Sequence, residues 1–244
     1  MFDKKLTLKK THDFSVSKCP KLVVVLIHGI ASDSSTYNHA LKYLEGIASL
    51  KDVRFITFDL LGSGESLKDN RLNYDYKDQL EALHNSIKKL RLHIPLVLVG
   101  HSLGTFIVTR YAATYKKSVK KLILISPPIY TERDLKNPAF ELGIKMFKEA
   151  VSVRNRAILE EKSFINSMNL IVLDRNNYKV LSELKTPTTL IYGNMDQLIA
   201  IYNMPQILKD NPKYLTAIQT EGRHGVSRDK YTKLVKILEE VLNA

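Results

Sequence analysis

A serine between two glycines is the residue of this chain best placed to do chemistry. The stretch from Leu96 to Ala112 reads LVLVGHSLGTFIVTRYA, in which an apolar run leads into the motif G-x-S-x-G and then into a helical pattern. Such a serine lies in a strained turn, and Gly100 and Gly104 remove side chains that would clash there. Backbone N–H groups at the start of the helix stabilise negative charge nearby. Ser102 is therefore predicted to be a nucleophile.

A serine hydroxyl attacks only after a base has removed its proton, so the motif requires a histidine and an acid elsewhere. In the chain order typical of this motif, the acid comes next and the histidine last. Asp196 follows the strand-like stretch TPTTLIYG, and His224 follows LTAIQT. Because functional loops gather at the carboxyl ends of parallel strands, both side chains are expected beside Ser102. Asp59 and Asp174 are the other candidate acids.

Short apolar runs alternate with longer amphipathic stretches, a pattern typical of parallel strands joined by crossover helices. The runs predicted as buried strands are Lys21–Ile27, Val53–Phe58, Leu96–Val99, Leu122–Ile125, Thr188–Tyr192 and Leu215–Gln219. The stretches predicted as helices are Thr36–Leu50, Tyr76–His93 and Ser227–Leu242. The segment 1–15 is predicted to add an antiparallel edge hairpin. Together they predict an α/β fold with a mostly parallel central sheet flanked by helices.

One stretch interrupts the alternation with a purely helical pattern. Its apolar residues recur at helical spacing: Phe140, Ile144, Phe147 and Val151. Residues 129–164 are therefore predicted to form a helical cap, and residues 1–128 and 165–244 to form the core. Apolar side chains of the cap, Met146 included, either line a pocket over the nucleophile or pack on the core.

Two further motifs complete a resemblance to the α/β-hydrolase family that covers nearly the whole chain. His28-Gly29-Ile30, after the first long strand, resembles the oxyanion loop of that family. Asp59 opens the stretch DLLGSGES, which is similar to the family's D-x-x-G-x-G-x-S turn. The resemblance implies an α/β-hydrolase fold in which the cap is inserted after the sixth core strand.

The resemblance also implies a role for each site residue. Ser102 is the nucleophile, His224 the general base and acid, and Asp196 the residue that orients the histidine. The backbone N–H groups of Ile30 and Leu103 form the oxyanion hole. The residues expected to support the site are His28, Gly29, Gly100, His101 and Gly104.

The family pattern also limits the candidates for the acid. Some members carry it after the preceding core strand, but here that place reads ISPP at residues 125–128 and holds no carboxylate. This favours Asp196. The family often places glycine directly before the histidine, whereas this chain has Arg223.

These roles indicate a serine hydrolase resembling carboxylesterases, which cleaves esters of small to medium acyl chain through an acyl-enzyme intermediate. Lipases, monoacylglycerol lipases, thioesterases and carbon–carbon bond hydrolases use the same triad, and the fold does not choose among them. Dehalogenases and epoxide hydrolases are disfavoured, because their nucleophile is an aspartate. A relative that binds a ligand without turnover is the alternative from another class.

Composition sets the remaining expectations. The 244 residues, of which 44% are hydrophobic, suit one large domain or one domain with an insert. The formal net charge is +12, but the lysines are spread along the chain and no nucleic-acid motif is present. A solvated lysine-rich surface is predicted, with attraction to an anionic partner as the alternative. The predicted partner is a small-molecule ester, with no nucleic acid, and a homodimer is left open.

No segment suggests a membrane or an export signal. The chain has no apolar run of the roughly 18 residues that a membrane span needs, and residues 1–14 lack the apolar centre of a signal peptide. A cytoplasmic location without stable membrane insertion is expected. Cys19 is the single cysteine, and the histidines show no ligand spacing, so neither a metal nor a cofactor is expected.

Overall fold

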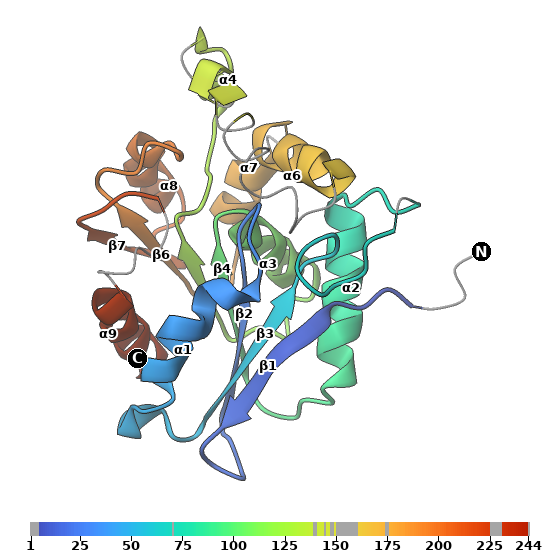
Figure 1. The fold of residues 1–244 in the computed structure, drawn as a ribbon. Coiled ribbons are helices and arrows are strands. Elements are labelled where there is room, and N and C mark those ends of the chain that lie inside the picture. Colours follow the sequence, from blue (N-terminus) through green and yellow to red (C-terminus); the bar gives the residue numbers. More distant parts are fainter. Residues whose placement is uncertain are drawn as a thin grey trace.

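A seven-stranded sheet forms the centre of the computed structural model, which describes residues 5–69, 71–138, 141–143, 145–146, 149, 161–173, 176–224 and 231–243. The strands are β1 (Lys9–Ser15), β2 (Leu22–Ile27), β3 (Val53–Asp59), β4 (Leu96–His101), β5 (Lys121–Ile125), β6 (Thr188–Gly193) and β7 (Leu215–Thr220). Their order across the sheet is β1-β3-β2-β4-β5-β6-β7, and every neighbouring pair except β1 and β3 is parallel (Figure 1). The prediction of an α/β fold around a mostly parallel sheet is confirmed.

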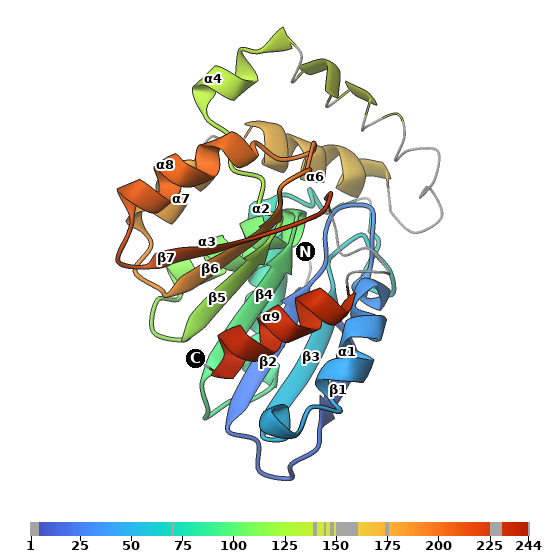
Figure 2. The same ribbon diagram turned by 90° about the vertical axis from the view of Figure 1, so that its left-hand side faces the viewer.

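Helices cover both faces of this sheet, as Figure 2 shows. The α-helices described are α1 (Asn38–Leu44), α2 (Tyr76–Lys89), α3 (Leu103–Thr114), α4 (Glu132–Leu135), α6 (Glu161–Leu173), α7 (Asn176–Glu183), α8 (Met204–Asp210) and α9 (Tyr231–Asn243). Short 3₁₀ helices are η1 (Ser34–Tyr37), η2 (Ala48–Leu50) and η3 (Ile201–Asn203). Helices α1 and α9 pack on one face, and α2, α3, α7 and α8 on the other.

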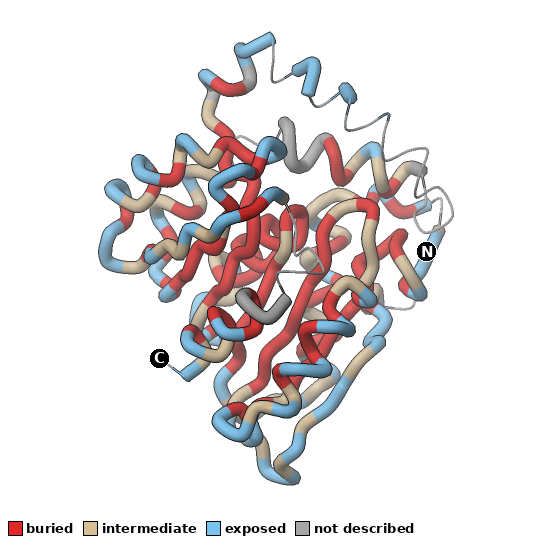
Figure 3. Tube along the Cα trace, turned by 60° about the vertical axis from the view of Figure 1, so that its left-hand side comes forward, coloured by how far each residue is buried: buried red, intermediate tan, exposed pale blue. Residues whose placement is uncertain are grey.

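The two helical layers explain why β2 is apolar at every position. Val23, Val25 and Ile27 pack in the core on the side of α2 and α3. Val24 and Leu26 alternate with them and pack on the side of α1 and α9. All five side chains are at most 1% exposed. Figure 3 shows the same distribution, with buried residues along the strands and exposed ones on the outer helices. A strand buried on both faces has no polar side to alternate with.

The N-terminal segment forms one strand where a hairpin was predicted. Strand β1 pairs with β3, and the residues before it run along α2 instead of pairing as a second strand. The N–H of Leu8 donates to Ser86 Oγ at 2.7 Å, and Asn85 Nδ2 donates to the carbonyl of Leu6 at 2.9 Å. Leu8 is 6% exposed, so this docking buries the side chain that a hairpin would have used.

The helical segment that interrupts the alternation follows β5, the fifth strand of the described chain, and not the sixth as predicted. The predicted hairpin accounts for the extra strand. The described part of residues 129–164 includes α4, while Phe140, Ile144, Phe147 and Val151 lie outside the described residues. Met146 is 61% exposed. The boundary predicted after residue 164 falls inside α6, so the division into cap and core stays a prediction.

Figure 1 places α4 and α6 beyond the carboxyl ends of the parallel strands. Ser102 follows the carboxyl end of β4, at the same end of the sheet. Helix α6 is also held to the turn after β3, because Ser163 Oγ donates to the carbonyl of Leu61 at 3.2 Å. Helices α4 and α6 and Ser102 therefore lie at the same end of the sheet.

Candidate active site

Ser102 occupies a strained turn between β4 and α3. Its backbone angles are φ 50° and ψ −117°, in a region that residues with a side chain rarely adopt. The turn is held because the Ser102 N–H donates to the carbonyl of Ile125 at 2.9 Å and the Ser102 carbonyl accepts the N–H of Thr105 at 3.0 Å. The residue is 6% exposed. The strain lifts the hydroxyl out of the sheet and fixes its position.

The two glycines of the motif allow two close backbone approaches. A Cβ on Gly100 would lie 2.6 Å from the carbonyl carbon of Gly104. A Cβ on Gly104 would lie 2.3 Å from the carbonyl oxygen of Ile27 and 2.6 Å from that of His28. These atoms belong to the backbone, so they cannot swing away as a flexible side chain would. The glycines therefore let α3 begin directly against β2 and β4.

Gly104→Ala is expected to lower the free energy of unfolding by roughly 3 kcal/mol, because the methyl group would push β2 and α3 apart. Gly143→Ala is the matched control, since no atom lies within 4 Å of a Cβ at that helical position. This control should change stability by less than about 1 kcal/mol, in the stabilising direction. Urea unfolding of both variants measures the difference, and equal small shifts would contradict the packing argument.

His224 and Asp196 lie beside Ser102, as the chain order predicts. His224 Nε2 is 3.1 Å from Ser102 Oγ, and His224 Nδ1 is 2.9 Å from Asp196 Oδ2. The three residues follow β4, β6 and β7, whose carboxyl ends lie at one edge of the sheet. With an ionised Asp196, Nδ1 carries the hydrogen and Nε2 is free to accept the proton of the serine.

Asp196 is held as a carboxylate by several donors. Its residue is 4% exposed, and burial by itself would raise the pKa. The hydrogen bond and charge of His224, the N–H of Leu198 at 2.9 Å and the hydroxyl of Ser126 outweigh that effect, so the pKa of Asp196 is lowered from 3.8. The carboxylate is therefore ionised at neutral pH.

Ser126 is a site residue that the sequence analysis did not single out. It stands directly after β5, within the ISPP stretch that holds no carboxylate, and its hydroxyl helps to lower the pKa of Asp196. Its φ of 48° is a second positive value beside the site. The place that carries the acid in some relatives thus supplies a polar group that favours the ionised acid here. Its position after a core strand was the signal available in the sequence.

Asn194 is the second residue that the sequence analysis missed. Its Oδ1 accepts the N–H of Gly222 at 3.1 Å, across 28 positions of the chain. The carbonyl of Gly222 in turn accepts the N–H of Met195 at 2.8 Å. These bonds join the loop that carries Asp196 to the loop that carries His224. No local pattern in the sequence marks Asn194, because its partner is set by the pairing of β6 with β7.

The loop after β2 lies against the nucleophile. A Cβ on Gly29 would lie 3.1 Å from Ser102 Cβ and 3.0 Å from His101 Nδ1. Ile30 follows in this loop, and Leu103 is the first residue of α3. Since Ile27 of β2 is paired with Gly100 of β4, the two backbone segments run side by side up to the serine.

Hydrogen bonds of His28 and Asp59 to backbone groups hold this loop in place. Leu60 donates its N–H to His28 Nε2 at 2.9 Å, so the hydrogen is on Nδ1, which donates to the carbonyl of Gly29 at 2.8 Å. Asp59 accepts the N–H groups of Ser34 and Glu65, each at 2.8 Å. Both carboxylate oxygens of Asp59 are thus used in backbone turns. Asp174, the other alternative acid, lies outside the described residues.

Residues 23–144 match the family model of the alpha/beta hydrolase fold, which is half of the 244-residue chain. The chain belongs to the α/β hydrolase fold family. The matched segment includes the loop after β2, the turn after β3 and the serine motif. The resemblance inferred from the sequence is therefore confirmed.

Known α/β hydrolases similar to this one include lipases. Lipase 1 of Psychrobacter immobilis is 26% identical over 229 residues, which cover 82% of this chain and 70% of the lipase. The "Probable lysophospholipase BODYGUARD 5" of Arabidopsis thaliana is 32% identical over 121 residues, or 49% of this chain. The Arabidopsis relatives are much longer than this chain, since the matches span 27% of BODYGUARD 5 and 23% of BODYGUARD 1.

Solved structures share the fold over almost the entire length of this α/β hydrolase. The monoacylglycerol lipase of Paleococcus ferrophilus has a TM-score of 0.72 at 19% identity, covering 98% of this chain and 99% of its own. A bromoperoxidase from Bacillus anthracis has a TM-score of 0.74 at 20% identity, with 96% and 94% covered. At these identities the likeness shows the fold alone.

Other kinds of site find little support in the described residues. No three histidine, cysteine, aspartate or glutamate side chains among them are grouped so that they could hold a metal ion. None of the helices in this part of the α/β hydrolase has the length and apolar character needed to cross a membrane. Cys19 is exposed.

Two histidines near the candidate site, His28 and His101, should make this α/β hydrolase sensitive to acid. Burial lowers the pKa of His28 below 6.5, and burial followed by the charge of His224 lowers the pKa of His101 to about 3. Below pH 6.5 both histidines take up protons in the unfolded chain but not in the fold. The free energy of unfolding is therefore expected to fall as the pH drops from 6.5 toward 4, by roughly 1 kcal/mol per pH unit from His101, and His28 acts in the same direction below pH 6.5.

Urea unfolding at several pH values measures this slope. His101→Gln removes one of the two groups and is expected to make the slope shallower by roughly 1 kcal/mol per pH unit. His93→Gln, at an exposed position, is the control and should leave the slope unchanged. A His101→Gln slope equal to that of the unchanged protein would rule out a neutral His101.

Proposed function

We propose that this α/β hydrolase is a serine hydrolase that cleaves carboxylic esters of small to medium acyl chain. The proposal depends on two hydrogen-bond distances that link three side chains. His224 Nδ1 lies 2.9 Å from Asp196 Oδ2, and His224 Nε2 lies 3.1 Å from Ser102 Oγ. A serine, an imidazole and a carboxylate in this order form the arrangement that activates a hydroxyl for acyl transfer. A protein that only binds its ligand has no need of this alignment.

The first half of the reaction forms an acyl-enzyme. Ser102 Oγ bonds to the carbonyl carbon of the ester while its proton moves to His224 Nε2. Asp196 stabilises the resulting imidazolium through Nδ1. The carbonyl electron pair moves onto the oxygen, and the N–H groups of Ile30 and Leu103 donate hydrogen bonds to it. Each of these bonds stabilises the transition state by roughly 3 kcal/mol. When the carbonyl re-forms, the alcohol leaves with the proton from His224.

The second half repeats these steps with water as the nucleophile. His224 takes a proton from water, and the oxygen of the hydroxide formed attacks the acyl carbon bound to Ser102 Oγ. The same two N–H groups hold the second oxyanion. When it collapses, Ser102 Oγ leaves, takes the proton from His224 and releases the carboxylic acid. The protein is then ready for the next ester.

A helical cap over residues 129–164 would set the choice of acyl chain. The loop after β5 leads from Ser126, beside Asp196, into α4. Helix α4 is also tied to the loop after β6, because Asn203 Nδ2 donates to Asp134 Oδ2 at 2.7 Å. Helix α4 is therefore held near the loop that carries the acid, as one wall of a binding pocket would require.

Lipid esters are the second candidate substrate. Relatives that carry the names lipase and lysophospholipase favour it, and one of these matches covers 82% of this chain. Thioesters and carbon–carbon bonds use the same groups and are further outcomes of the same test. The fold does not separate these substrates, because it positions the reacting groups and not the acyl chain.

A substrate panel tests the proposal. Nitrophenyl esters graded from acetyl to palmitoyl are measured beside the matching thioesters and monoacylglycerols, and a fluorophosphonate labels the protein for peptide mapping. Labelling at Ser102 with the highest kcat/KM on the shorter esters is the expected result. Activity confined to long chains would move the assignment to lipases, and folded protein that neither labels nor turns over would favour a binding role.

A further inference from the structure

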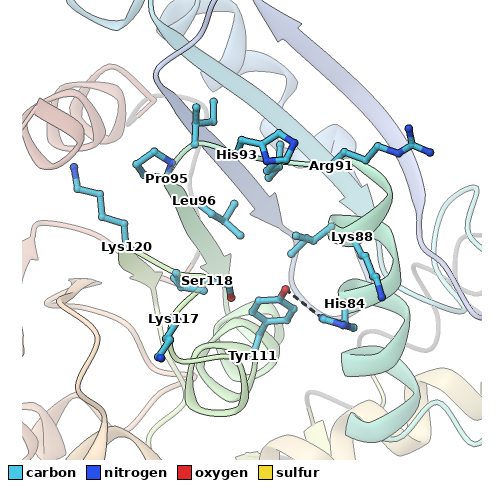
Figure 4. Close-up of a pocket in the computed structure, with 14 residues that line it drawn as sticks. His84, Lys88, Arg91, His93, Pro95, Leu96, Tyr111, Lys117, Ser118 and Lys120 are labelled. Atoms are coloured by element: carbon cyan, nitrogen blue, oxygen red, sulfur yellow. Dashed lines mark hydrogen bonds between the residues drawn. The ribbon is translucent and has the colours of Figure 1, made fainter.

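A cleft lies at the other end of the sheet from Ser102. It has a volume of about 1040 Å³ and is lined by nine residues between His84 and Leu96, from α2 into β4, and by five residues between Tyr111 and Lys120, from α3 to the residue before β5. Leu96 opens β4, whereas Ser102 follows the end of that strand. Six strand residues span roughly 20 Å, so the cleft is separate from the candidate active site. Figure 4 shows its lining.

Four permanent cations surround this cleft and define what is here named the basic cleft. Lys88 and Arg91 stand on one side, and Lys117 and Lys120 on the other (Figure 4). No aspartate or glutamate belongs to the lining. Within the part of the chain that the structure describes, none of the four forms an ion pair with a carboxylate. Six cationic side chains elsewhere do form such pairs: Lys9, Lys10, Lys21, Arg54, Arg71 and Lys179.

Helix dipoles account for only part of this charge. Lys88 lies in the last turn of α2, where the helix dipole favours a cation. Arg91, Lys117 and Lys120 lie beyond the ends of α2 and α3. Arg91 also adopts a φ of 50°, at a position after the helix where glycine or asparagine is usual. The chain thus keeps a long cationic side chain where the backbone favours a small residue.

The inner surface of the basic cleft is apolar. Leu96 is 3% exposed, Val119 7% and Ile87 8%, and all three line the cleft. Tyr111 closes one side, where its hydroxyl lies 3.5 Å from His84 Nδ1. Small-molecule sites are commonly apolar cavities of this size with a few charged groups that fix orientation. The lining therefore offers contacts to an apolar group and to an anion at the same time.

We propose that the basic cleft binds a small organic anion that carries an apolar portion, such as an alkyl phosphate. The phosphate would be attracted by all four cations and would form charge-assisted hydrogen bonds with those nearest to it. The alkyl portion would lie along Leu96 and Val119. Part of the formal net charge of +12 would then serve to bind a ligand at this cleft, while the rest keeps the surface solvated.

Titration calorimetry with octyl phosphate tests this proposal on the full chain. The cleft variant carries Lys88→Gln, Arg91→Gln, Lys117→Gln and Lys120→Gln. The matched variant carries Lys42→Gln, Lys77→Gln, Lys185→Gln and Lys236→Gln, which removes the same charge at exposed positions outside the cleft. The cleft variant is expected to bind at least about tenfold more weakly, and the matched variant to stay within about twofold.

Two further probes test which part of the ligand matters. Methyl phosphate is expected to bind more weakly than octyl phosphate, because it lacks the apolar portion. Vesicles of phosphatidylglycerol test an anionic surface as the alternative. Equal weakening in both variants, equal binding of the two phosphates, or binding to vesicles without binding to octyl phosphate would each overturn the proposal. Ester hydrolysis is read in parallel and should be unchanged in the cleft variant.

Discussion

Ser102→Ala is expected to lower kcat/KM for nitrophenyl esters by roughly 10⁴-fold. In the proposed mechanism the substitution removes the oxygen that bonds to the acyl carbon, so that no acyl-enzyme could form. Any remaining rate would come from water that His224 activates near the N–H groups of Ile30 and Leu103. Labelling by a fluorophosphonate is expected to disappear completely. Steady-state kinetics and intact-protein mass spectrometry measure the two effects.

The fold should survive this change. Ser102 Oγ contacts His224, whereas the turn itself is held by backbone atoms of Ser102, Ile125 and Thr105. Ser182→Ala is the matched control, because its hydroxyl makes only a local bond to the carbonyl of Lys179 on α7. This control should keep full activity and labelling. Undiminished turnover by Ser102→Ala would remove Ser102 from the mechanism.

Asp196→Asn is expected to lower kcat/KM by about 10³- to 10⁴-fold with little change in KM. The asparagine amide can donate to His224 Nδ1, which places the ring hydrogen on Nε2. In that tautomer Nε2 cannot accept the proton of Ser102. The amide also carries no charge to stabilise the imidazolium. Steady-state kinetics across the ester panel give the measurement.

Asp52→Asn is the control for this substitution. Asp52 forms an ion pair with Lys21 at 3.0 Å and immediately precedes β3, at the end of the sheet away from Ser102. Its variant should keep the activity of the unchanged protein. Activity of Asp196→Asn within about tenfold of the unchanged protein would show that another group orients His224.

The sequence predicted the candidate site well where chemistry depends on local patterns. The motif around Ser102 needs only a strand, two glycines and a helix, and all of these are neighbours in the chain. Asp196 and His224 could be inferred because each follows a strand, and parallel strands bring their carboxyl ends to one edge. The apolar runs located all six predicted strands, and five of them are buried because helices cover both faces of the sheet. The prediction that the sixth, β7, is buried was wrong, because β7 lies at the edge of the sheet and only Leu215 in it is buried.

The sequence could not show which distant groups would meet. Asn194 and Gly222 are joined by the register of β6 and β7, and Ser126 reaches Asp196 because β5 lies beside β6. The predicted N-terminal hairpin was wrong, because the segment before β1 finds its partners on α2.

What the sequence by itself determined is the kind of fold and the identity of the three residues that meet at the candidate site. Hydrophobic periodicity and the serine motif act over a few residues, so they can be read without knowing the partners. Only the tertiary structure decided the bonds that hold Asp196 and the position of the basic cleft. The cleft gathers Lys88 and Lys120 from segments 32 positions apart, and their shared excess of charge exists only once the sheet has brought α2 and α3 together.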